Sequence, residues 1–112
     1  MAVVIGAFGA HGLKGRVAED LMVIYQTGVQ YHFYHTFALL CVSFLLLRYP
    51  QAELLKWSGG FFIAGTLIFS GSLYVMALTG FRWLGAVTPI GGVALIVGWL
   101  MLALAAYKGF GE

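Results

Sequence analysis

The chain of 112 residues has very few charged side chains, with six Lys and Arg and four Asp and Glu, or 9% of the total. A soluble domain carries roughly 25% charged residues, which keep its surface hydrated. Cysteine is also scarce, and Cys41 alone excludes an intrachain disulfide. The net charge of +2 is too small and too scattered to predict a nucleic-acid partner.

Apolar residues take the place of the missing charges, since 62% of the chain is hydrophobic and the mean hydropathy is +0.95. Three long uncharged runs follow Asp20, Lys56 and Arg82, and they contain 27, 25 and 25 residues. A helix needs about 20 residues to cross a bilayer, so each run is long enough for one crossing and too short for two. A transmembrane barrel would instead show alternating segments of about ten residues. The sequence therefore predicts a single-domain, all-α integral membrane protein that crosses a bacterial-type inner membrane several times.

We expect helices over about 1–11, 18–48, 57–79 and 88–107, of which the last three span the bilayer. The first 13 residues are uncharged but too few, because a helix of about ten residues rises only about 15 Å. That rise is about half of the hydrocarbon core. We therefore expect a short N-terminal helix, in a chain that starts inside a helix that was longer.

The stretch 18–48 begins with an amphipathic pattern. Five residues fall on one helical face: Val17, Leu21, Ile24, Gly28 and Tyr31. The pattern predicts that the first part lies in the membrane interface and that the crossing proper begins near Tyr31. Farther along, Thr88 followed by Pro89 predicts a helix start, with a capping hydroxyl and a proline at the first helical position.

Small residues recur at helical spacing and predict where helices pack closely. Inside lipid, close approach of two backbones is a main source of helix association, and small side chains permit it. The candidate packing positions are Gly6, Ala10, Gly60, Ala64, Gly91, Gly98 and Ala105.

Several motifs carry a resemblance to a known family: GAFGAHGLK at 6–14, QYHFYH at 30–35, FSGSLY at 69–74, TPIGG at 88–92 and GW at 98–99. With these motifs the chain resembles the small membrane proteins called domain of unknown function 423, which include the transmembrane protein 256 group. The resemblance covers nearly the whole chain and implies a four-helix membrane fold. Family members look as if they carry roughly a dozen more apolar residues before the first motif, which would complete a first crossing. The family's function is uncharacterised, so the resemblance implies no catalytic residue.

The expected crossings bring these motifs into one half of the bundle, together with most of the polar side chains. Lipid forms no hydrogen bonds with such groups, so they must satisfy one another or enclose water. We expect one polar cluster there, formed by His11, Gln30, His32, His35, Ser70, Ser72, Tyr74 and Thr88.

The three histidines allow two interpretations. His32 and His35 are three positions apart on a helix, and with His11 they would supply three imidazoles, which zinc and copper prefer. The more ordinary interpretation is hydrogen bonding between helices, and no cysteine or carboxylate joins the set. We therefore expect no metal and no cofactor.

Three classes of function remain open. The first is a non-enzymatic protein that acts by helix packing, as an oligomer or as an accessory subunit of a membrane complex; its partners would be the lipid bilayer and other membrane subunits or itself. The second is permeation of a proton or a small solute through an oligomer, and the third is a histidine-based metal or redox site. Enzymatic activity is not expected, because no acid is placed to orient an imidazole for Ser70 or Ser72. The glycines of VVIGAFGAHG lack the strand–helix–strand unit that dinucleotide binding requires.

Overall fold

The computed structural model describes residues 2–13 and 18–110, and within these ranges the chain is helical with no strand. The elements are α1 (Ala2–Phe8), the π-helical turn η1 (Gly9–Leu13), α2 (Glu19–Arg48), α3 (Glu53–Thr79), the 3-10 turn η2 (Arg82–Ala86) and α4 (Thr88–Tyr107). Three of the helices are long and apolar enough to cross a membrane. The all-α membrane fold predicted from the sequence is confirmed.

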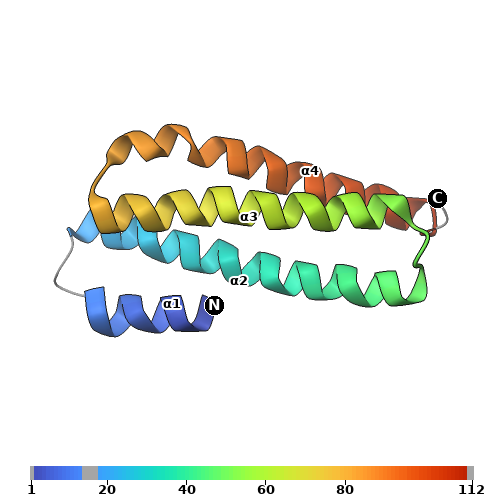
Figure 1. The fold of residues 1–112 in the computed structure, drawn as a ribbon, viewed down its shortest axis with the longest axis horizontal. Coiled ribbons are helices and arrows are strands. Elements are labelled where there is room, and N and C mark those ends of the chain that lie inside the picture. Colours follow the sequence, from blue (N-terminus) through green and yellow to red (C-terminus); the bar gives the residue numbers. More distant parts are fainter. Residues whose placement is uncertain (1, 14–17, 111–112) are drawn as a thin grey trace.

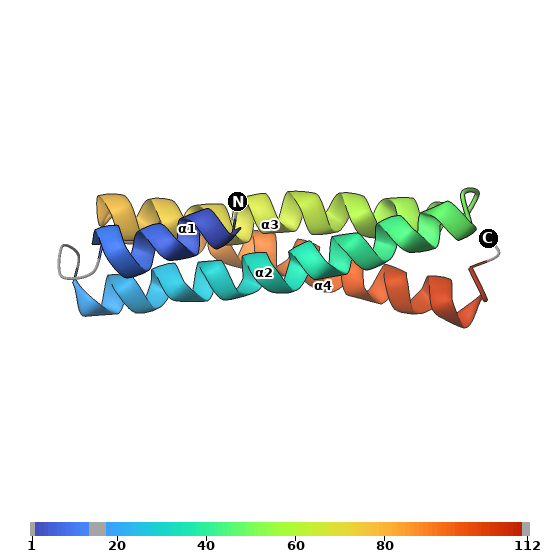
Figure 2. The same ribbon diagram turned by 90° about the horizontal axis from the view of Figure 1, so that it is seen from below.

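Helix α3 lies at the centre, antiparallel to α2 on one side and to α4 on the other (Figure 1). The short helix α1 runs antiparallel to α2 along its first half, and its N-terminus lies near the middle of the bundle (Figures 1 and 2). The Cα trace measures 50 × 26 × 15 Å. Each of the three long helices therefore presents part of its circumference to lipid.

The helix ends have local causes. Helix α3 begins at Glu53, four residues before the expected position 57. The Glu53 carboxylate lies in the first turn, where it interacts favourably with the positive end of the helix dipole, and it contacts Lys56 at 3.1 Å. Helix α3 ends at Gly80, whose φ of 75° closes the helix in the left-handed conformation. Helix α4 begins at Thr88 with Pro89 in its first turn, where the missing N–H breaks no hydrogen bond. The predicted capping hydroxyl is wrong, because Val87 occupies the N-cap position and no side chain caps the helix.

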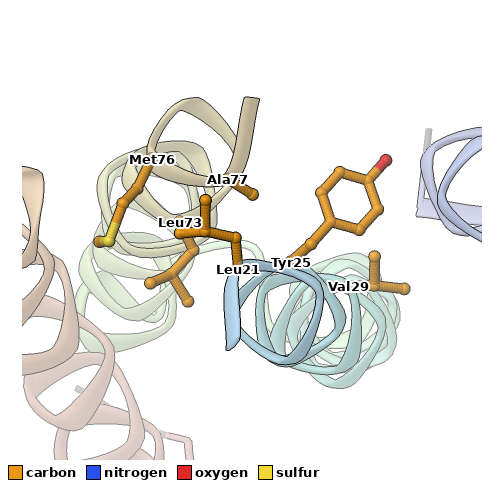
Figure 3. Close-up of a cluster of buried hydrophobic side chains, with 6 residues drawn as sticks. All are labelled: Leu21, Tyr25, Val29, Leu73, Met76 and Ala77. Atoms are coloured by element: carbon orange, nitrogen blue, oxygen red, sulfur yellow. The ribbon is translucent and has the colours of Figure 1, made fainter. Parts of the chain in front are cut away.

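The predicted interfacial segment at the start of α2 is wrong. Helix α2 is continuous from Glu19 to Arg48, and its first half packs against α3 rather than lying in the membrane interface. Figure 3 shows the resulting cluster, formed by Leu21, Tyr25, Val29, Leu73, Met76 and Ala77. Of the amphipathic stripe, Leu21 and Gly28 are buried against neighbouring helices and Ile24 is partly buried, whereas Tyr31 is exposed. Val17, the first residue of that stripe, lies outside the described residues.

Tyr25 connects α1 to this cluster. Its ring is buried, while its hydroxyl points away from the other labelled side chains (Figure 3) and donates a hydrogen bond of 2.5 Å to the carbonyl of Ile5. Gly9 lies against the same ring so closely that a Cβ there would overlap it. The contact between α1 and α2 therefore combines ring packing with one hydrogen bond.

We expect Tyr25→Phe to loosen α1 without unfolding the bundle. The phenyl ring keeps the packing, whereas the lost hydrogen bond removes about 1 kcal/mol, or roughly a fivefold change in local opening. Amide hydrogen exchange in detergent should therefore be about fivefold faster over Ala2–Phe8. Tyr34→Phe is the matched control, because Tyr34 is exposed and its hydroxyl bonds to no described residue. Equal exchange in both variants would show that the hydroxyl does not hold α1.

Two further clusters continue the core along α3. One contains Ala38, Val42, Phe62 and Leu95, and the other contains Ala52, Leu55 and Ala105. Together the three clusters extend from one end of α3 to the other. Each long helix contributes to at least two of them.

The candidate packing positions divide into an inner set, buried or partly buried between helices, and an outer set, exposed on the surface. Gly91 and Gly98 are buried where α4 crosses Phe69 and Phe62 of α3, and a Cβ at either glycine would overlap those residues. Ala105 is buried as well. Gly6 is partly buried, and a Cβ there would lie 3.2 Å from Val29 Cγ1.

The other candidates, Ala10, Gly60 and Ala64, are exposed. Sequence reasoning overlooked Gly28 and Gly65. A Cβ at Gly28 would overlap Tyr74, and one at Gly65 would overlap Leu95.

Candidate functional site

His35 is a buried polar residue in the middle of the bundle, with 4% of its surface exposed. Trp99 of α4 donates its indole N–H to Nε2 of His35 at 3.0 Å. Nε2 is therefore the acceptor, so the ring proton lies on Nδ1 and is donated to the carbonyl of Tyr31 at 2.7 Å. The Phe62 ring of α3 packs against the His35 ring with centroids 5.6 Å apart. Both nitrogens of His35 are thus occupied within the bundle, and this residue joins all three long helices.

His32 bonds a different helix, although it lies only three residues from His35. Its Nδ1 lies 2.9 Å from the hydroxyl of Tyr74 on α3. The two imidazoles therefore point at separate partners, one on α3 and one on α4. Among the described residues they share no hydrogen-bonding partner.

Serine hydroxyls make the remaining buried contacts between helices. Ser70 donates to the carbonyl of Gly28 at 2.8 Å, which connects α3 to α2. The hydroxyls of Ser72 and Thr88 lie 2.6 Å apart, which connects α3 to the start of α4. Each contact satisfies a polar group that lipid would leave unpaired.

The eight expected polar residues therefore do not form one cluster. Three of them, His32, Ser70 and Tyr74, line one groove between α2 and α3. His35, Ser72 and Thr88 make separate contacts, while His11 and Gln30 are exposed and make no side-chain hydrogen bond to a described residue. Within residues 2–13 and 18–110, no three His, Cys, Asp or Glu side chains are placed to hold a metal ion.

Sequence reasoning missed two residues of these contacts. Ser58 is fully buried and donates to the carbonyl of Gly98 at 2.7 Å. Trp99 was noted only within a motif, yet it supplies the donor to His35. Ser58 lies opposite Gly98, and Trp99 follows Gly98 in the sequence. Proximity to this glycine is the feature from which both residues could have been predicted.

The charged side chains among the described residues lie at the ends of the bundle. Arg82 in η2 and Asp20 at the start of α2 form an ion pair of 2.6 Å on the surface. Both side chains are more than half exposed, so solvent screens the attraction and the pair adds little stability. The pair nevertheless places the start of α2 beside the connection between α3 and α4.

The sequence matches the family model described as protein of unknown function (DUF423) over residues 5–92. The chain belongs to the DUF423 family. The family resemblance carried by the glycine, histidine and serine motifs is thereby confirmed.

Curated relatives of this DUF423 protein are membrane proteins by name. It is 44% identical over 108 residues to the UPF0382 membrane protein YwdK of Bacillus subtilis, which covers 96% of this chain and 88% of the relative. A UPF0382 membrane protein of Staphylococcus epidermidis is also 44% identical, over 96% of this chain and 87% of its own length. No solved structure matches. Together with the three long apolar helices, these relatives identify a multi-pass membrane protein.

Proposed function

We propose that this DUF423 protein is a non-enzymatic membrane protein that acts by packing its helices against a second copy of itself. An accessory subunit of a membrane complex would use the same kind of surface against a different chain. The observation that carries the proposal is an open small-residue face on α3, the central helix. That face bears Gly60 and Ala64, both exposed.

These two residues lie in a shallow groove of about 280 Å³ with Trp57 and Phe61, which we call the outer groove. A Cβ on Gly60 would meet no atom within 4 Å. At about 100° per residue, the outer groove lies roughly opposite the stripe of α3 that contains Leu55, Phe62 and Leu73 and packs toward α2. It therefore faces away from the rest of the bundle.

The inner glycines show what such a face does when it has a partner. Gly91 and Gly98 let α4 approach the backbone of α3, and both are buried. Gly60 and Ala64 have the four-residue spacing that lets two membrane helices approach closely. The two aromatic rings that flank the outer groove add contact area.

The polar contacts also support a non-enzymatic role. The buried histidine and serines bond to other helices or to the backbone: His35 to Trp99, Ser58 to Gly98 and Ser70 to Gly28. A nucleophile or a general base needs a free atom directed at a substrate. These side chains instead form the hydrogen bonds that hold the helices together.

Gly60→Leu tests the proposal, because a leucine would hold a second helix away from the outer groove. We expect at least a roughly tenfold weaker association between copies in phosphatidylcholine vesicles, measured by single-molecule photobleaching across protein densities. Ala103→Leu is the control, since Ala103 is an exposed small residue on α4 and lies outside the outer groove.

The expected pattern is association in the parent and in Ala103→Leu, and its loss in Gly60→Leu. A parent protein that is monomeric at every density would overturn the oligomer proposal. Equal association of the parent and Gly60→Leu would place the contact elsewhere.

A further inference from the structure

The side of α2 that faces away from α3 carries exposed polar residues, and we call it the polar face of α2. It is formed by Gln26, Gln30 and Tyr34, which follow one another at four-residue spacing. At about 100° per residue, these positions lie roughly opposite Leu21 and Gly28, which are buried toward α3. Two residues of the polar face belong to the QYHFYH motif, yet they take part in none of the contacts between helices described above.

Helix α1 runs along a different side of α2 (Figure 2). That side bears Tyr25 and Val29, which contact α1 directly. At helical spacing the same side continues through Thr36 and Leu40. A first helix extended along this line would therefore leave the polar face open.

The polar face reaches the middle of the bilayer. At about 1.5 Å per residue, about 42 Å of helix separates Asp20 from Arg48, the charges at the two ends of α2. A hydrocarbon core of about 30 Å centred between these charges places Gln30 about 9 Å below its surface and Tyr34 at its centre. Gln26 lies near the edge of the core, where headgroups and water can reach its amide.

The two deeper residues of this face have polar groups without a partner. The Gln30 amide and the Tyr34 hydroxyl make no hydrogen bond to a described residue, and both side chains are exposed. By contrast, Thr27 and Thr36 of the same helix each donate to the carbonyl four residues earlier, at 3.0 and 2.7 Å. Lipid offers no hydrogen bonds, so an open amide in the core is unfavourable until another protein supplies a partner. Polar side chains at this depth accordingly mark contacts between helices.

The chemistry of the polar face defines the partner. No Asp, Glu, Lys or Arg occurs between residues 21 and 47, so a charged partner group would find no opposite charge here. A neutral carboxamide or hydroxyl is complementary, because the Gln30 amide both donates and accepts hydrogen bonds. Phe37 and Phe44, both exposed, continue this side of α2 as an apolar surface. A partner helix can therefore lie along the whole membrane-spanning length of α2.

A second copy is not the expected occupant of this face. The outer groove, where we propose that two copies meet, lies on the side of α3 that faces away from α2. Copies inserted the same way round pair about axes normal to the membrane, and two such contacts on different faces would join them into endless rows. Most homo-oligomers are closed instead. The choice of a different chain thus rests on the proposed function.

We propose that the polar face of α2 binds a transmembrane helix of a different membrane protein, one that carries a neutral carboxamide or hydroxyl side chain at mid-bilayer depth. The polar side chain of the partner pairs with the Gln30 amide and the Tyr34 hydroxyl. Its apolar residues lie along Phe37 and Phe44. The DUF423 protein then joins a second copy through α3 and another membrane protein through α2.

The test uses the purified protein in phosphatidylcholine vesicles with two synthetic peptides as probes. Each peptide has about 20 leucines between terminal lysines, enough to cross the bilayer, and one of them has a glutamine at its centre. Energy transfer from labelled protein to labelled peptide, at low peptide density, measures binding. We expect the glutamine peptide to bind about fivefold more tightly than the all-leucine peptide, because it alone can hydrogen-bond to the polar face. Equal binding of the two peptides would overturn the proposal.

Two variants locate the contact. Gln30→Leu should reduce binding of the glutamine peptide to the level of the all-leucine peptide. Gln26→Leu is the matched control, because it makes the same change on the same face near the headgroups, and it should bind like the parent. Both side chains are exposed, so the packing of the bundle is kept. Normal binding by Gln30→Leu, or an equal loss in both variants, would contradict pairing at mid-bilayer depth.

A second measurement separates this contact from the outer groove. Gly60→Leu should bind the glutamine peptide like the parent, and Gln30→Leu should self-associate like the parent in the photobleaching assay. Weaker self-association of Gln30→Leu would show that the polar face contacts a second copy, which would overturn the proposal of a different chain. A monomeric parent that binds the glutamine peptide through Gln30 would support the polar-face contact and overturn the outer-groove proposal alone.

Discussion

Gly91→Ala is expected to lower the free energy of unfolding by about 2 kcal/mol, although it adds a single methyl group. The new Cβ would overlap the backbone of Phe69 on α3, and a backbone cannot rotate aside as a side chain does. The helices must separate locally, and the dispersion contacts of the interface are lost with them. The intrinsic preference of helices for alanine, about 1 kcal/mol over glycine, offsets only part of this loss.

Gly92→Ala is the control, since it makes the same chemical change at the neighbouring position. A Cβ there would lie 3.6 Å from the Phe69 ring, which is an ordinary contact. Unfolding in mixed dodecylmaltoside and dodecyl sulfate micelles should therefore find Gly92→Ala at least as stable as the parent. Equal stability of the two variants would contradict the close crossing of α4 over α3.

His35→Leu should lower the free energy of unfolding by about 3 kcal/mol. The change fills a similar volume but leaves the Trp99 indole N–H without an acceptor among the described residues. It also removes the hydrogen bond to the Tyr31 carbonyl. The substitution therefore removes one hydrogen bond between α2 and α4 and one within α2.

A double-mutant cycle separates the indole–imidazole bond from the rest of this effect. Trp99→Phe removes the donor, so His35→Leu should cost about 1 kcal/mol less in the Trp99→Phe background than in the parent. His11→Leu, at an exposed position, is expected to change stability by less than about 0.5 kcal/mol. Purely additive effects of the first two substitutions would contradict the bond.

The crossings could be predicted from the sequence because charge alone marks their ends. Charges are excluded from the hydrocarbon core, so the uncharged runs 21–47, 57–81 and 83–107 had to be membrane-spanning helices. The expected range 88–107 and the helix Thr88–Tyr107 agree because the Thr-Pro start is a strong local signal. Local signals predicted the bounds of α4, whereas α3 begins at Glu53, four residues before the predicted position 57.

The partners of the polar side chains could not be predicted, because they depend on how each helix is rotated about its axis. A soluble helix shows its rotation by an apolar stripe, but α3 and α4 are apolar on all sides. The sequence therefore placed His32 and His35 on one face without showing that one bonds α3 and the other α4. The same uncertainty made inner and outer glycines look alike, although Gly91 is buried and Gly60 is exposed.

Disulfide cross-linking in native membranes tests the proposed self-association most directly. With Cys41 replaced by Ser, a cysteine at Ala64 in the outer groove should join two copies, because two cysteines bond only when their Cα atoms approach within about 7 Å. A cysteine at Ile96, which is exposed on α4, is the control. We predict a covalent dimer for Ala64→Cys, its loss when Gly60→Leu is added, and little dimer for Ile96→Cys. No dimer at Ala64, or equal amounts at both positions, would contradict packing through the outer groove.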